Sequence, residues 1–180
     1  NFYSNWFRNK IKGMWSNDQT ELHYINIGKS RLAGVETMCK IQINRHINMH
    51  GAYNYLYTSK DADGVRLSSS SPHSGNIRAE YNTRIPRYAT VVNLSGNIMG
   101  KKKFDVLDEL EIDGKKVEAY YQAKVNPYCL WDLTVSQYIM QNLRITAGIT
   151  NLFDYTSDRV TFNTSTSPGR NYFIACNYTL

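Results

Sequence analysis

The sequence lacks any long apolar run. A membrane-spanning helix needs about 20 consecutive apolar residues, and no stretch of this 180-residue chain approaches that length. The mean hydropathy of −0.50 points the same way. These values exclude a helical membrane protein. They do not exclude a membrane β-barrel, because only alternate residues of its strands meet lipid.

Cysteine is scarce, with three residues in the chain. Cys39, Cys129 and Cys176 cannot all pair with one another, and their spacing lacks the C-x-x-C pattern typical of a zinc site. Alternation places Cys39 and Cys176 on the apolar faces of strands, where a free cysteine acts as a small hydrophobic side chain. The cysteines therefore predict no metal site.

Catalytic motifs are also missing. The chain has no G-x-S-x-G nucleophile elbow, no H-E-x-x-H and no Gly-rich phosphate loop. Residues 61–64 (Asp-Ala-Asp-Gly) match half of a calcium loop, without its third acidic position and later glutamate. A turn rich in Asp and Gly explains this segment without metal. We expect no enzyme activity, no catalytic residues and no cofactor.

The formal net charge of +6 raises the question of nucleic acid. The positive charges are scattered, and their one run, residues 101–103, is followed by four acidic residues: Asp105, Asp108, Glu109 and Glu111. We expect no nucleic-acid binding. A solvated loop and attraction to anionic lipopolysaccharide or to an anionic ligand remain open for this run.

Alternation of apolar and polar residues is what the chain has in abundance. Near the C-terminus one face carries Tyr172, Ile174, Cys176, Tyr178 and Leu180. Such a strand is typical of a membrane β-barrel, although a soluble sandwich has the same period. The alternation predicts eight strands, at residues 2–13, 22–43, 47–58, 76–84, 87–99, 128–139, 143–152 and 171–180. Gly34 predicts a bulge or kink, and Asp113-Gly114 predicts a hairpin inside the longest connection.

The predicted connections alternate in length. Residues 44–46, 85–86 and 140–142 are short turns, whereas 59–75, 100–126 and 153–169 are long loops. Outer-membrane barrels show this asymmetry, with short turns facing the periplasm. The 14 tyrosines fit either the aromatic girdles of a barrel or the general preference of tyrosine for strands. A barrel would turn the following polar residues toward its lumen: Glu36, Lys40, Gln42, Asn48, His50, Asn54, Arg78, Glu80, Asn93, Asn97, Asp132 and Arg144.

Five segments resemble, in order, the end of a TonB-dependent outer-membrane receptor. The family's N-x-G-x-A-x-x-x-G-V-E strand is similar to residues 26–36, and the strand and loop that follow it are similar to residues 52–58 and the Pro72-His73 region. Residues 131–136 resemble the antepenultimate strand. The NLFD-type and PGR-x-Y/F motifs match residues 151–154 and 168–172.

The resemblance implies an all-β chain whose residues 1–180 form the C-terminal portion of a transmembrane β-barrel. About eight antiparallel strands would belong to a barrel of about 22. The signal peptide, TonB box and plug domain would belong to a longer parent protein. The resemblance further implies a bacterial outer-membrane receptor that takes up a ferric siderophore, haem or cobalamin. Its partners would be the TonB complex, the barrel-insertion machinery, outer-membrane lipid and lipopolysaccharide.

Candidate site residues follow from loop position and side-chain type. The ligand contacts that we predict are Arg66, His73, Tyr120, Tyr121 and Arg159. Haem receptors of the family use loop histidines, but their FRAP and NPDL motifs are absent, so ordinary loop polarity stays open for His73. The last strand carries the predicted assembly signal at Tyr172, Ile174, Tyr178 and Leu180. Leu180 replaces the aromatic residue with which family members usually end.

Two alternatives remain at this point. The first is a self-contained eight-stranded outer-membrane barrel with an adhesion or structural role, because eight strands can close around their own side chains. The second is a soluble β-sandwich that acts as a binding module. In that case the apolar faces bury one another.

Overall fold

The computed structural model describes residues 1–16, 21–60, 71–112, 115–140, 142–157 and 168–179, with only the backbone described at 14–15, 104–112 and 115–123. Among these residues no helix is long and apolar enough to cross a lipid bilayer. The described chain forms ten strands: β1 (Phe2–Trp15), β2 (Leu22–Gln42), β3 (Ile47–Thr58), β4 (His73–Asn82), β5 (Thr90–Met99), β6 (Lys102–Ile112), β7 (Lys115–Val125), β8 (Tyr128–Ile139), β9 (Leu143–Thr150) and β10 (Asn171–Tyr178).

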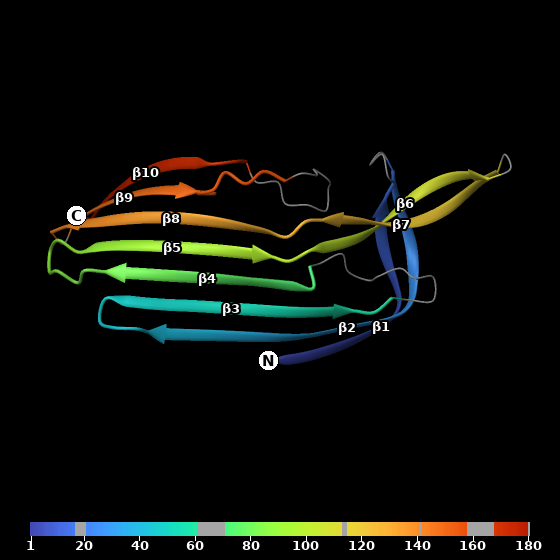
Figure 1. Cartoon of the computed structure of the whole chain (residues 1–180), viewed down its shortest axis with the longest axis horizontal. Coiled ribbons are helices and arrows are strands. Elements are labelled where there is room, and N and C mark those ends of the chain that lie inside the picture. The colour runs from blue at the N-terminus through green and yellow to red at the C-terminus, as the bar shows by residue number, and fades with distance from the viewer. Residues whose placement is uncertain (17–20, 61–70, 113–114, 141, 158–167, 180) are drawn as a thin grey trace.

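Eight of these strands form one antiparallel sheet, in the order β1-β2-β3-β4-β5-β8-β9-β10 (Figure 1). The eight strands predicted from alternation are thus confirmed. Among the described strands, β6 and β7 pair with each other alone, and they project beyond the sheet (Figure 1). The predicted hairpin turn, Asp113-Gly114, lies outside the described residues. The strands on either side of it, β6 and β7, pair from Ile112 and Lys115 to Lys102 and Val125.

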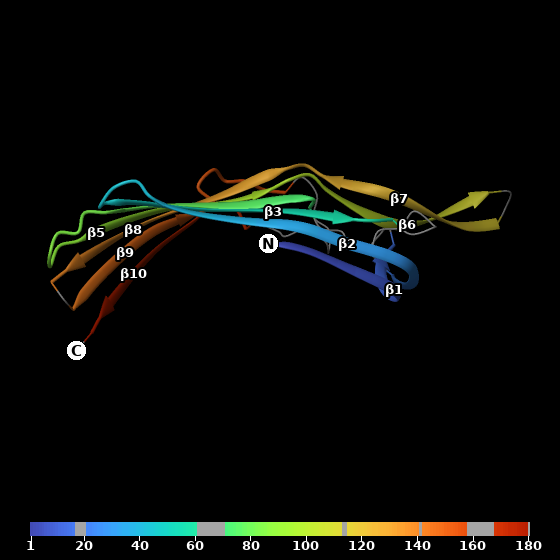
Figure 2. The same ribbon diagram turned by 90° about the horizontal axis from the view of Figure 1, so that it is seen from below.

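The sheet is a single curved layer (Figure 2). Strands β1 and β10, at its two edges, bend toward the same side, as the wall of a cylinder does. The pleat turns successive side chains to opposite faces, so the register aligns apolar residues in rows across the sheet. One such row contains Met49, Ala79, Leu94, Leu133, Ile149 and Tyr172.

The apolar face has no second layer of described strands against it. Ile174 is 77% exposed, and Tyr55, Val135 and Tyr178 are exposed too. A soluble sandwich buries this face under another sheet, so the fold contradicts that alternative. Among the described strands β1 pairs only with β2 and β10 only with β9, so the sheet does not close on itself. A self-contained eight-stranded barrel is therefore not what the chain forms.

The connections follow the predicted asymmetry. Residues 43–46, 83–89 and 140–142 join strands at one end of the sheet (Figure 1). The long connections 59–72, 100–127 and 151–170 lie at the opposite end, together with the shorter connection 16–21 between β1 and β2. We call these the short-turn end and the long-loop end. The backbone amide of Tyr88 donates to the Ile85 carbonyl oxygen at 3.2 Å, which tightens the turn that contains Pro86.

Several predicted strand boundaries are wrong. Strand β4 begins at His73 rather than 76 and ends at Asn82 rather than 84, while β5 begins at Thr90 rather than 87. Side chains cap the connecting turn: Asn82 Oδ1 accepts from the Arg84 amide at 2.8 Å, and Thr83 Oγ1 accepts from the Thr90 amide at 2.9 Å. The positive φ angles of Arg84 and Arg87 also end the extended conformation.

The bulge predicted at Gly34 is also wrong. Pairing runs without interruption from Gly34 to Tyr3 on one side and to Leu56 on the other. The glycine is needed for space instead, because the Tyr3 ring and the Tyr55 carbonyl oxygen lie where a Cβ would project. A neighbouring strand, rather than the local backbone, therefore explains this glycine.

Replacing Gly34 with valine is expected to impair assembly of β1 on β2. The new Cβ would lie 2.6 Å from the Tyr55 oxygen, and overpacking of this kind costs about 1–3 kcal/mol. The measurement is the fraction of the protein that migrates as a folded, heat-modifiable species in gel electrophoresis. Gly28→Val is the matched control on the same strand, because no atom lies within 4 Å of its Cβ position. Equal folded fractions for the two variants would contradict the steric explanation.

Candidate functional site

The concave side of the sheet is polar, and we call it the polar face. The register places there every residue predicted to face a lumen: Glu36, Lys40, Gln42, Asn48, His50, Asn54, Arg78, Glu80, Asn93, Asn97, Asp132 and Arg144. One cross-strand row runs from Lys40 through His50 and Arg78 to Ser95 and Asp132. Since a strand shift of one residue would reverse the faces, this agreement supports the whole register.

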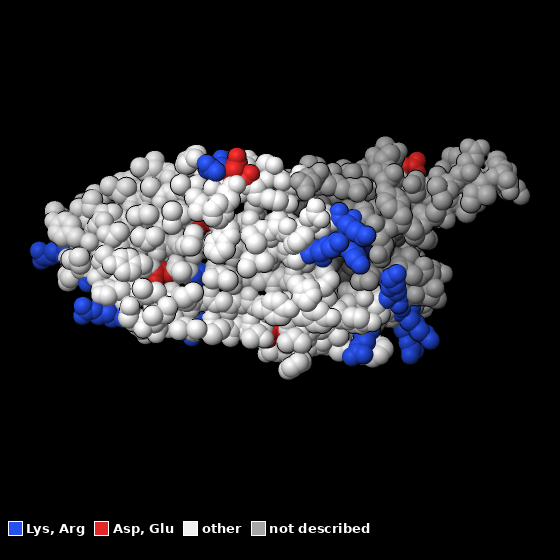
Figure 3. All heavy atoms as spheres, viewed as in Figure 1, with Lys and Arg blue, Asp and Glu red and all other residues white. Residues whose placement is uncertain are grey.

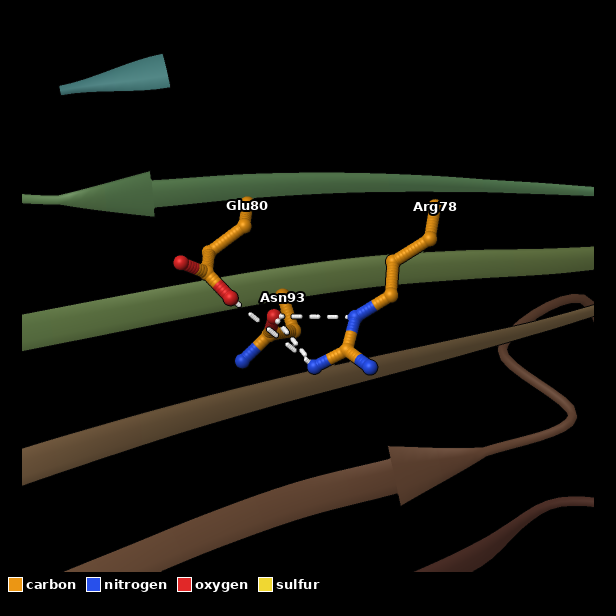
Figure 4. Close-up of polar contacts among 3 residues, drawn as sticks. All are labelled: Arg78, Glu80 and Asn93. Atoms are coloured by element: carbon orange, nitrogen blue, oxygen red, sulfur yellow. Dashed lines mark hydrogen bonds and ion pairs between the residues drawn. The ribbon is translucent and has the colours of Figure 1, made fainter. Parts of the chain in front are cut away.

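Arg78 is a cation of the polar face that contacts Asn93 and Glu80 (Figure 4). Its Nε and Nη2 atoms donate to Asn93 Oδ1 at 3.3 and 3.1 Å. Nη2 also lies 3.9 Å from the Glu80 carboxylate. Because a guanidinium has five N–H donors in a fixed fork, these contacts hold its orientation while other donors remain available to a group in front of the sheet.

A groove of about 390 Å³ lies nearer the long-loop end and includes Glu36, Asn54, Ser74, Asn76 and Asn97 in its lining. The Asn54 Oδ1 atom is buried without a hydrogen-bond partner among the described residues. A buried acceptor of this kind costs about 1–3 kcal/mol if it stays unpaired. Carboxylate and amide oxygens accept hydrogen bonds, so this groove is suited to N–H groups of a partner.

The segment Asn151-Leu-Phe-Asp154 forms a turn directly after β9, at the start of the connection to β10. Asn151 is only 5% exposed and has a φ of 51°, a conformation that asparagine tolerates better than most residues. Its side chain donates to the Tyr155 carbonyl oxygen at 2.7 Å and accepts from the Tyr155 amide at 2.8 Å. Its backbone amide donates to the Asp132 carboxylate at 2.9 Å.

Asp154 extends these contacts to the start of β10. Its Oδ1 atom accepts from the Arg170 amide at 2.7 Å, next to Gly169 with its φ of 78°. A side-chain hydrogen bond with Tyr172 is the main cause that raises the pKa of Arg170, and the Asp154 carboxylate acts in the same direction. We call this set of contacts the β9–β10 anchor, made by Asp132, Asn151, Asp154, Tyr155 and Arg170. It shows why the two C-terminal motifs of the sequence occur together.

The convex side is apolar, and we call it the apolar face. Over its middle it is almost free of charged side chains, which gather toward the two ends of the sheet (Figure 3). Cys39, Cys129 and Cys176 all lie on this face as free thiols. The prediction that Cys39 and Cys176 lie on apolar faces is therefore confirmed.

His73 also lies on the apolar face, as the first residue of β4 rather than in a loop. Its Nδ1 atom is 2.7 Å from the Tyr53 hydroxyl oxygen, and its ring centroid is 5.1 Å from that of Tyr55. The sequence did not predict this cluster, because only the β3–β4 register brings the three rings together. A role of His73 in ligand binding stays a prediction.

The other predicted site residues are described only in part. Arg66, Arg159, Leu180 and the candidate calcium segment 61–64 lie outside the described residues, and Tyr120 and Tyr121 belong to β7, where only the backbone is described. Tyr172, Ile174 and Tyr178 lie on the apolar face of β10 and are exposed. Within the described part of the chain, there is no group of three or more His, Cys, Asp or Glu side chains that could hold a metal ion.

Comparison with solved structures gives the same fold throughout the chain. A ferric enterobactin receptor from Pseudomonas aeruginosa is 17% identical with a TM-score of 0.69, and the match covers 98% of this chain and 28% of that one. The siderophore receptor PirA from Acinetobacter baumannii is also 17% identical, with a TM-score of 0.70 and the same coverage of both chains. The outer-membrane ferripyoverdine receptor of P. aeruginosa is 16% identical with a TM-score of 0.70, and the match covers 98% of this chain and 24% of that receptor.

The chain thus spans about a quarter of the length of these receptors. A family model described as "TonB dependent receptor-like, beta-barrel" matches residues 1–152. This match includes β1 to β9, and so most of both faces of the sheet. The chain therefore belongs to the TonB-dependent receptor β-barrel family, whose members lie in the outer membrane of Gram-negative bacteria.

Proposed function

We propose that this chain is the C-terminal wall of a receptor that imports a ferric siderophore through the outer membrane. Haem and cobalamin are the other ligands that the sequence resemblance implies. The observation that carries the proposal is the polar concave face. It occurs in a fold that three siderophore receptors share over 98% of this chain. In a receptor this face would line the lumen and the apolar face would meet lipid.

The polar face is suited to contacts with a plug domain. Arg78 offers N–H donors, whereas Glu36 and Asn54 offer acceptors that have no partner among the described side chains. A plug supplies many backbone and side-chain groups to such a wall, and each hydrogen bond to a charged group contributes about 1.5–3 kcal/mol. The TonB complex would act on that plug from the periplasm and provide the energy for uptake.

The two ends of the sheet fit separate roles in this proposal. The long-loop end would face the cell exterior. Of the predicted ligand contacts, Tyr120 and Tyr121 belong to β7, and Arg66 and Arg159 come between β3 and β4 and between β9 and β10 in the sequence. On the edge strand β10, the apolar residues Tyr172, Ile174 and Tyr178 would be recognised by the barrel-insertion machinery. The open hydrogen-bonding edges of β1 and β10 would pair with the remaining strands of the parent barrel.

A strain that lacks the parent gene is expected to lose growth on at least one ferric siderophore as the only iron source. Ferric enterobactin, ferripyoverdine and haem are supplied one at a time, and cobalamin uptake is measured in parallel. Uptake of radiolabelled iron should fall at least tenfold for the transported complex and return with the intact gene. Normal growth and uptake on every source would contradict the proposal.

A further inference from the structure

The apolar face is interrupted by a groove of about 380 Å³ between β2 and β5. Its lining includes Cys39, Gly51, Gly75, Ile77 and Ile98. The volume is within the range of about 300–1,000 Å³ found for small-molecule sites. The groove exists because two glycines on neighbouring strands leave a gap in a surface otherwise covered by side chains.

Gly51 is the open point of this groove. A Cβ added there would have no neighbour nearer than 4.0 Å, whereas the Trp131 ring covers the corresponding position at Gly96. Both glycines lie in one cross-strand row, with Ile77 between them. An unfilled gap loses van der Waals contacts on one side, so a flexible alkyl chain from the bilayer would gain contacts at Gly51 that the protein does not provide.

The residues of the apolar face change from purely apolar side chains to tyrosine and histidine toward the long-loop end. Tyr53 and His73, joined by a hydrogen bond, form part of the groove lining, and Tyr55 and Tyr57 follow beyond the groove along β3. Tyrosine and histidine combine an apolar body with a polar tip, which suits the membrane–water interface. The strand therefore passes from an acyl-chain environment to an interfacial one.

A group of cations follows these aromatic residues. Arg8 and Lys29 lie directly opposite each other on β1 and β2, and Arg31 stacks on Trp6 with 4.8 Å between Cζ and the ring centroid. Among the described residues no carboxylate lies within ion-pair distance of these three cations. Like charges directly opposite are destabilising, so an anion between Arg8 and Lys29 would relieve their repulsion.

The separation of groove and cations matches one leaflet of the membrane. Arg31 pairs with Ser59, eight residues beyond Gly51, which is roughly 26 Å along a strand. With a strand tilt of about 45° this becomes roughly 18 Å along the membrane normal, against about 20–22 Å for one leaflet with its head groups. Phosphates bound at the cations would therefore place an acyl chain of the same lipid near Gly51.

We propose that one lipopolysaccharide molecule of the outer leaflet docks on this strip, with its phosphates at Arg8, Lys29 and Arg31 and an acyl chain in the Gly51 groove. The inference depends on the proposed receptor only through its orientation in the membrane, and not on the imported nutrient. Three cations that have no carboxylate partner among the described residues favour a lipid with more than one phosphate, which distinguishes lipopolysaccharide from ordinary phospholipid.

The test measures lipid that co-purifies with the full-length receptor from outer membranes in mild detergent, by native mass spectrometry. The intact protein should retain about one lipopolysaccharide per molecule. Lys29→Gln combined with Arg31→Gln should lower this retention at least tenfold, and Gly51→Leu, which fills the groove, about fivefold. The matched controls are Arg84→Gln combined with Arg87→Gln, which removes two cations at the short-turn end, and Ala79→Leu on the same apolar face. The controls should retain lipid as the intact protein does.

Three results would overturn the inference: retention of phospholipid alone by the intact protein, undiminished retention by the double cation variant, or equal loss in the controls. The heat-modifiable folded fraction is measured for every variant, so that misfolded protein does not count as lost binding. Siderophore-dependent growth is measured in the same strains. If the intact receptor retains lipopolysaccharide but the gene deletion strain shows no uptake defect, only the nutrient proposal is contradicted. If the receptor supports uptake but retains no lipopolysaccharide, only the lipid proposal is contradicted.

Discussion

Arginine at position 94 is expected to destabilise the receptor by about 2–4 kcal/mol in lipid vesicles, whereas arginine at position 95 should have little effect. Leu94 lies in the middle of β5 on the apolar face, in one row with Ala79 and Leu133. Ser95 is its direct neighbour on the polar face, between Arg78 on β4 and Asp132 on β8. Attraction to Asp132 therefore offsets the repulsion that an arginine at position 95 would meet from Arg78. An arginine on the lipid side of a barrel costs about 2–4 kcal/mol near the bilayer midplane.

The two substitutions introduce the same side chain into the same strand, so strand propensity and net charge are matched. Only the environment differs: hydrocarbon for Leu94→Arg, and a polar lumen for Ser95→Arg. The measurement is the free energy of unfolding of the full-length receptor by guanidinium in lipid vesicles. Equal costs for both variants, or a larger cost for Ser95→Arg, would show that the apolar face does not meet lipid.

The distribution of residues between the two faces could be predicted from sequence because it follows from covalent geometry. A strand turns alternate residues to opposite faces, so the polar residues from Glu36 to Arg144 needed no knowledge of pairing partners. The lengths of the connections then oriented the sheet. This part of the candidate site was therefore predictable almost residue by residue.

Features that depend on contact between strands were not predictable in the same way. Position 34 requires a glycine because the Tyr3 ring on the neighbouring strand occupies the space of a Cβ. The Tyr53–His73 hydrogen bond requires the β3–β4 register. The turn at 83–89 depends on side-chain caps from Asn82 and Thr83. Alternation alone carries no information about any of these contacts.

The C-terminal motifs form an intermediate case. Their resemblance to a family could be recognised in the sequence, whereas their physical role appears only in the β9–β10 anchor. Asn151 and Asp154 each use side-chain oxygens to hold backbone amides. These contacts hold the two ends of the connection between β9 and β10 together, and the Asn151 amide ties this connection to Asp132 of β8.

Replacing Asn151 with alanine is expected to destabilise the receptor by about 2–5 kcal/mol and to reduce its assembly. The substitution removes both partners of the Tyr155 backbone groups, and a buried unpaired group costs about 1–3 kcal/mol. Alanine also disfavours the φ of 51°, by about 1–2 kcal/mol. The free energy of unfolding in lipid vesicles and the folded fraction in outer membranes measure the two effects.

Two further variants separate these contributions. Asn151→Gly accepts the positive φ but makes no side-chain hydrogen bonds, so its cost should be lower than that of Asn151→Ala by about 1 kcal/mol. Asn177→Ala is the matched control, because Asn177 is an exposed residue of β10 outside the anchor, and its cost should stay within about 0.5 kcal/mol. If Asn151→Ala unfolds at the same guanidinium concentration as Asn177→Ala, the turn does not hold β8, β9 and β10 together, and the motif must be explained by a contact with a part of the receptor outside this chain.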